Sequence, residues 1–137
     1  MSRRHCLLAC FTMFSALGLA ACATAPSATE SQDALVQRFY QLVAAGDFDN
    51  SIRLVSARTI APEKLASFED KLRRLLTGAK RKIDSNGGLQ QVEVVERAFS
   101  EETQVTKVWV LVTYRDGSTR RERINLCQEN GVWKVQL

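Results

Sequence analysis

The sequence predicts an α+β domain in which three N-terminal helices pack on one face of a curved, four-stranded antiparallel meander sheet. Between residues 31 and 83, apolar side chains recur at the three- and four-residue spacing of a helical face. From residue 92 onward they recur at every second position, in segments that turn-forming residues separate. This change of period predicts helices first and strands afterwards.

The helical half divides at glycine and proline. The first helix is expected from Ser31, a suitable N-cap, to Gly46, where a residue without a Cβ suits a left-handed cap. A short helix should follow, and Pro62 fits the first turn of a third helix that ends before residues 86–88. Gly78 costs this third helix up to about 1 kcal/mol relative to alanine and is the position where a break would fall.

The strand half allows its turns to be chosen by register. A two-residue loop at Asn130-Gly131 sets Leu126 opposite Val135, apolar against apolar, as a type I′ hairpin requires. The preceding turn needs a three-residue loop with Gly117 left-handed, because a two-residue loop would bring arginine onto the buried face. The three-residue loop gives the pairs Val108–Ile124 and Val110–Glu122.

The first residues have the parts of a bacterial export signal. A positive start precedes an apolar segment that is too short to span ~30 Å of hydrocarbon. The sequence Leu19-Ala20-Ala21-Cys22 then resembles the lipobox of bacterial lipoproteins, whose cysteine receives diacylglycerol before cleavage ahead of it. The resemblance implies a signal peptide over residues 1–21 and a lipid on Cys22. The alternative is an ordinary secretory cleavage that happens to leave a cysteine there.

The lipobox also implies a location. Residues 22–30 would form the lipidated cysteine and a flexible tether, and residues 31–137 the folded domain. Ala23 stands where an aspartate favours inner-membrane retention, so the resemblance implies the periplasmic face of the outer membrane. The export route, general secretory or twin-arginine, stays open, because Arg3-Arg4 lacks the aromatic residue usual after a twin-arginine pair.

Residue counts exclude several kinds of chemistry. The only histidine, His5, would leave with the signal, so a mature Ser-His-Asp or Cys-His mechanism and a His-ligated metal site are excluded. With Cys22 lipidated, Cys127 has no partner for an intramolecular disulfide. The mature chain would carry 17 basic and 15 acidic side chains, too balanced for a dedicated nucleic-acid binder. We expect no metal or cofactor.

Short segments of the domain, taken in order, resemble a known family. They are Asp33–Tyr40, Ala45–Phe48, Gly87–Leu89, Thr113–Gly117 and Glu129–Val135. Together they look like an uncharacterised domain common in bacterial lipoproteins, within the nuclear-transport-factor-two-like, cystatin-like cone superfamily. The resemblance covers residues 31–137 and implies an α-α-α-β-β-β-β cone. It implies no activity, because the superfamily includes enzymes, binding modules and oligomerisation domains.

Catalytic members of that superfamily use a pocket between helices and sheet. The strand alternation places Glu96, Tyr114 and Glu122 on the inner face, with Tyr40 on the first helix. A buried carboxyl beside a tyrosine is suited to proton abstraction next to a carbonyl group. The alternative is that these residues lie at strand ends where the inner face meets water. No residue is identified as catalytic.

The outer sheet face is expected to carry Trp109, Leu111 and Cys127 among charged residues. An apolar patch on a face expected to be wet often marks an interface. The alternative is that neighbouring arginine side chains cover it. Cys127 would be reactive if it were exposed near a positive charge, and a small packed residue otherwise. Two basic runs, residues 80–82 and 120–123, are candidates for contact with anionic headgroups.

These observations predict a lipid-anchored envelope protein that is a non-catalytic binding or accessory module. The expected partners are the bilayer, through the acylated cysteine, and a second copy or another envelope protein, through the outer sheet face. The alternative function is a small-molecule-binding or isomerase- or dehydratase-like pocket, which requires a cavity of roughly 300 Å³ or more.

Overall fold

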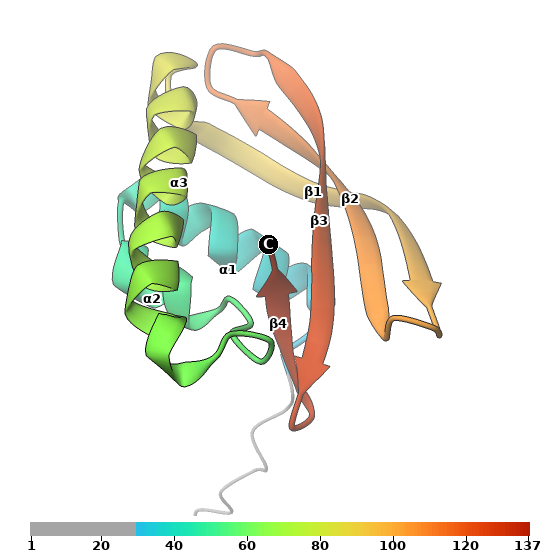
Figure 1. Ribbon diagram of the computed structural model, residues 1–137. Helices are drawn as coiled ribbons and strands as arrows, with labels where there is room; N and C mark the ends of the chain where they lie inside the picture. Colours follow the sequence, from blue (N-terminus) through green and yellow to red (C-terminus); the bar gives the residue numbers. More distant parts are fainter. Residues whose placement is uncertain (1–29) are drawn as a thin grey trace, which may run out of the picture.

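The computed structural model describes residues 30–137, so the predicted signal segment, Cys22 and nearly all of the tether lie outside the described residues. Within this range the helices precede the strands and lie on one side of the sheet (Figure 1), as predicted. The helical elements are α1 (Gln32–Ala45), α2 (Phe48–Arg53), the 3-10 helix η1 (Pro62–Lys64) and α3 (Leu65–Ser85). The strands are β1 (Leu89–Ser100), β2 (Val105–Tyr114), β3 (Thr119–Glu129) and β4 (Val132–Gln136).

The helix ends follow the capping chemistry of the sequence. The Ser31 side chain accepts a hydrogen bond from the Ala34 backbone N–H at 3.2 Å and caps α1. Gly46 ends the helix in the left-handed region, with φ of 77°. Helix α3 continues through Gly78 without a break. In residues 30–137 no helix is both long and apolar enough to cross a bilayer.

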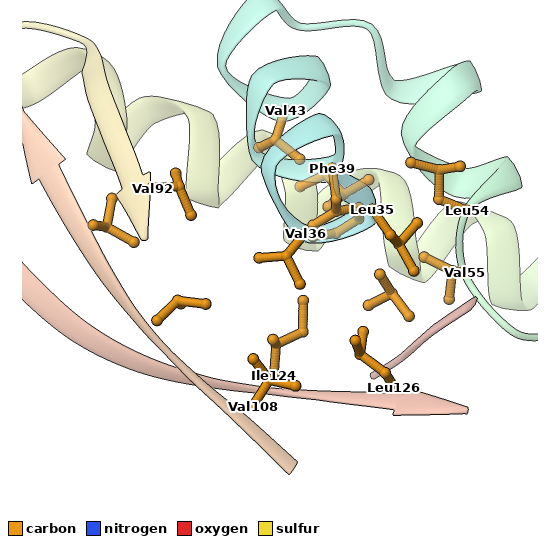
Figure 2. Packing of buried hydrophobic residues seen from close by; sticks show 14 of the residues in the cluster. Leu35, Val36, Phe39, Val43, Leu54, Val55, Val92, Val108, Ile124 and Leu126 are labelled. Carbon is orange, nitrogen blue, oxygen red and sulfur yellow. The ribbon is translucent and has the colours of Figure 1, made fainter. Parts of the chain in front are cut away.

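The core lies between α1 and the inner face of the sheet (Figure 2). Leu35 and Val36 of α1 are completely buried, as are Val108, Val110 and Leu126 of β2 and β3. The helical spacing of the first set and the two-residue spacing of the second bring all of them to one interface. Burial of each such side chain contributes about 1.5–3 kcal/mol, so this interface fixes where α1 sits on the sheet.

The two C-terminal hairpins have the predicted registers. Strands β2 and β3 join through a three-residue loop with Gly117 at φ of 87°, and Val108 pairs with Ile124. Strands β3 and β4 pair Leu126 with Val135, and both turn residues, Asn130 and Gly131, have positive φ, as a type I′ turn requires. Pairing β1-β2-β3-β4 is antiparallel throughout, which confirms the predicted meander.

Strand β1 departs from simple alternation at Val95. Val94 pairs with Val110, but the next paired residue is Glu96, opposite Trp109, so Val95 is an extra residue on β1. An inserted residue reverses the face of every side chain after it. The prediction that Glu96 points inward is therefore wrong. It lies on the outer face, and Arg97 takes the inner position instead.

Two glycines test the backbone requirements of this fold in opposite directions. Gly117→Ala should destabilise the protein by about 1 kcal/mol, because its φ of 87° is strained for a residue with a Cβ. Gly78→Ala should stabilise it by about 0.5–1 kcal/mol, because nothing lies within 4 Å of the new methyl group and alanine favours the helix. Denaturant unfolding of both variants measures the two changes, and equal signs would contradict this assignment.

Candidate functional site

Three of the four predicted pocket residues meet at the open end of the cone. The hydroxyl of Tyr40, on α1, donates a hydrogen bond of 2.7 Å to a carboxylate oxygen of Glu122 on β3. Tyr114, at the end of β2, is buried, lines the same cavity, and donates to no residue in the described part of the chain. The Arg120 guanidinium lies 3.3 Å from the other Glu122 oxygen. We call this group the cone mouth.

The electrostatics of the cone mouth keep both phenols protonated. Burial raises the pKa of Tyr40 far above its ordinary value, and the Glu122 carboxylate raises it further. Burial also raises the pKa of Tyr114, again with a contribution from Glu122. Each hydroxyl is therefore a hydrogen-bond donor at neutral pH, and the Tyr40 donor is occupied by Glu122.

The cavity beside these residues is small. Its volume is about 170 Å³, less than the roughly 300 Å³ expected of a site for a drug-sized ligand. Its apolar walls come from α3 and the C-terminal strands: Leu75, Leu76, Ala79, Ile83, Ile124 and Leu137. Phe39 and Leu72 are buried in the core below it, with Phe68 and Trp133 packed against that core.

The fourth predicted pocket residue, Glu96, is absent from the cone mouth because of the Val95 bulge. Its carboxylate forms an ion pair with Arg121 of β3 instead. Glu96 pairs with Trp109 across β1 and β2, and Arg121 pairs with Leu111 across β2 and β3. The ion pair thus crosses the outer face of β2 between its two apolar side chains.

The outer sheet face has three parallel rows of different chemistry. The β1 row is acidic, with Glu93 and Glu96. The β2 row is apolar, with Trp109 and Leu111, each partly exposed. The β3 row is basic and exposed; it consists of Arg121 and Arg123. The arginine covering considered as an alternative is thus partial.

Cys127, the third residue predicted for this face, is not accessible. It is completely buried, between Val105 on β2 and Lys134 on β4. It pairs with both across the sheet, and a small side chain between longer neighbours is covered by them. An exposed, reactive thiol is excluded at this position in the folded domain, and the small packed residue of the alternative is what the structure contains.

The sequence analysis missed a third surface, at the end where the described chain begins. Phe99, at the end of β1, is 57% exposed and Val132, at the start of β4, is 52% exposed. Partly buried Trp133 lies beside Phe99 in a groove of about 530 Å³ that Arg58 also lines. Each of the two exposed residues adjoins a turn, and an apolar residue beside a turn signal was the clue available in the sequence.

Metal binding has no candidate in the described range, where no three or more Asp, Glu, His or Cys side chains are grouped to hold an ion. The chemistry available is therefore that of the cone mouth and of the two surfaces.

The order of elements, the cone mouth and the patterned sheet define the class as an α+β cone domain of nuclear-transport-factor-two-like fold. The sequence pattern of the domain of unknown function DUF4878 matches residues 22–136, so the chain belongs to this family. No curated protein matches the chain significantly.

Solved structures support the fold. The chain is similar to a Campylobacter jejuni protein named as a candidate NTF2-like transpeptidase, with a TM-score of 0.67 and 18% identity over 75% of this chain and 94% of that one. A SEC-C motif containing protein from Rhodopseudomonas palustris gives a TM-score of 0.49 and 17% identity over 78% and 76%. At these identities the first likeness concerns the fold alone.

Removing the Tyr40 hydroxyl tests the cone mouth. Tyr40→Phe should lower the free energy of unfolding at neutral pH by about 1–2 kcal/mol, since a part-buried carboxylate loses its donor. Tyr114→Phe is the matched control and should cost less, because its hydroxyl donates to no described residue. Denaturant unfolding measures both, and a Tyr40→Phe variant as stable as the parent would contradict the bond's role.

The raised pKa of Tyr40 also gives a pH dependence. Its folded-state pKa lies above the ordinary value of about 10, so its stabilising effect is complete below pH 10 and declines as pH rises beyond it. The free energy of unfolding should therefore fall less steeply above pH 10 in Tyr40→Phe than in the parent.

Proposed function

We propose that the chain is a lipid-anchored module of the bacterial cell envelope that associates with a second copy through its outer sheet face and catalyses no reaction. The proposal depends most on one observation, the acidic, apolar and basic rows side by side on that face. The lipobox resemblance at Leu19–Cys22 supports the anchor. Ala23 supports placement at the periplasmic leaflet of the outer membrane.

The charge rows select one arrangement of two copies. With a two-fold axis parallel to the strands, β1 of one copy lies over β3 of the other, so Glu93 and Glu96 face Arg121 and Arg123. With the axis across the strands, β1 lies over β1 and like charges oppose each other. Only the first arrangement is self-complementary. Trp109, in the apolar row between the charges, then lies at the centre of the contact, where buried tryptophans carry most binding energy.

The cone mouth supports a second candidate function, the binding of a small ligand. The specific observation is the convergence of Tyr40, Tyr114 and Glu122 beside apolar walls. A cavity of about 170 Å³ suits a ligand of the size of benzene, which an apolar cavity of similar volume accommodates. Catalysis would need a free carboxylate, whereas Glu122 is held by Tyr40 and Arg120.

Substitution of the lipid-accepting cysteine tests the anchor. The parent chain should incorporate a labelled fatty acid and sediment with membranes, and Cys22→Ser should do neither, because no other residue accepts the diacylglycerol. Mass spectrometry of the N-terminal peptide and membrane fractionation measure this. Cys127→Ser is the matched control and should leave both results unchanged, since Cys127 is buried in the domain. A Cys22→Ser chain held as firmly as the parent would rule the anchor out.

Charge reversal tests the association surface. Trp109→Glu and Glu96→Arg should each weaken dimer formation at least about tenfold, one by burying a charge and the other by opposing like charges. Mixing Glu96→Arg with Arg123→Glu should restore association, because each reversed row then meets its opposite. Analytical ultracentrifugation in detergent measures the dissociation constant, with circular dichroism to verify folding.

Leu75→Glu is the matched control for this surface, since Leu75 is equally apolar and 55% exposed but lies on α3. Unchanged association of Trp109→Glu, or no recovery in the mixture, would place any interface elsewhere.

A further inference from the structure

The surface at the chain's entry point has the composition of a membrane contact. Phe99 and Val132 are among the most exposed large apolar residues in the described chain, and Trp133 lies beside Phe99. We call these three residues the tether-end surface. Aromatic rings with one apolar and one polar edge favour the interfacial zone of a bilayer.

The tether-end surface lies where the described chain begins. Asp33, in the first turn of α1, forms an ion pair with Arg97, two residues before Phe99 on β1. Glu30, the first described residue, pairs with Arg38 on the same helix. In Figure 1 the start of α1 and the β3–β4 hairpin lie at the same lower end of the molecule.

The length of chain before Glu30 brings this end to the lipid. Seven residues separate Cys22 from Glu30, a reach of at most about 29 Å. A weak contact becomes occupied when a tether this short keeps the effective concentration in the millimolar range. The end of the domain nearest the anchor is thus the end that meets the bilayer.

We propose that Phe99, Val132 and Trp133 insert into the interfacial zone of the phospholipid bilayer and seat the domain upright on the membrane. This inference rests on the lipid anchor proposed above. The inserted side chains lose water-exposed apolar area that the folded chain otherwise leaves uncovered.

Apolar contact rather than headgroup charge carries this docking. Arg58 adds a positive charge beside the groove, while Glu101 and Glu102 occupy the neighbouring β1–β2 turn. The basic run at residues 80–82 is at the other end of α1, because the Lys80 side chain packs beside Gly46. Helix α1 is about 21 Å long, so we no longer expect that run to reach the headgroups.

The two tryptophans of the chain provide the test. The lipidated full-length protein is reconstituted into vesicles whose phospholipids carry brominated acyl chains, which quench nearby indoles. In Trp109→Phe the remaining Trp133 should lose roughly half of its fluorescence, and in Trp133→Phe the remaining Trp109 should lose little. Equal quenching of the two indoles, or none of Trp133, would overturn the docking.

Matched aspartates separate insertion from proximity. Val132→Asp, in the Trp109→Phe background, should abolish the quenching, whereas Leu75→Asp on α3 should not, although both replace a half-exposed apolar residue. Vesicles with and without phosphatidylglycerol should quench equally, and quenching only with this anionic lipid would overturn apolar insertion. Fatty acid mass on Cys22 is measured in each sample. Lipidated protein without quenching refutes the docking alone, while unlipidated protein refutes the anchor.

Discussion

The packing of α1 against the inner face of the sheet is the contact on which the other features depend. Leu35 and Val36 are completely buried there, and their position places the rest of the helix. Its middle brings Tyr40 to Glu122, and its first turn brings Asp33 to β1. An exposed ion pair contributes about 1 kcal/mol or less, below the burial of one core side chain. Apolar packing therefore sets the helix position, and both the cone mouth and the chain's entry point follow from it.

Much of the fold could be predicted because alternation on a sheet leaves few acceptable registers. A loop one residue shorter at Gly117 would have put an arginine among buried valines, so the sequence itself selects the three-residue loop. The same parity correctly places Tyr114 and Glu122 on the inner face beside Tyr40. These predictions succeed because each depends only on whole-residue spacing and on the cost of burying charge.

The features that sequence reasoning missed depend on local geometry. The bulge at Val95 stands between two valines, with no glycine or proline to signal it, and it moved Glu96 from the pocket to the outer face. Cys127 is on the predicted face but buried, because cover there depends on neighbouring side-chain size rather than on parity. Phe99 became a surface residue because β1 extends beyond the start of α1, a length that alternation does not reveal.

The charge rows and the anchor constrain the same two-fold axis independently. Two copies tethered to one bilayer must have their lipidated ends on the same side, which requires an axis along the membrane normal. In Figure 1 strand β3 runs between the β2–β3 turn and the β3–β4 hairpin, at the end where α1 begins. An upright domain on the tether-end surface therefore has this strand close to the membrane normal. The charge rows pair only about an axis parallel to the strands, the axis that one shared bilayer allows.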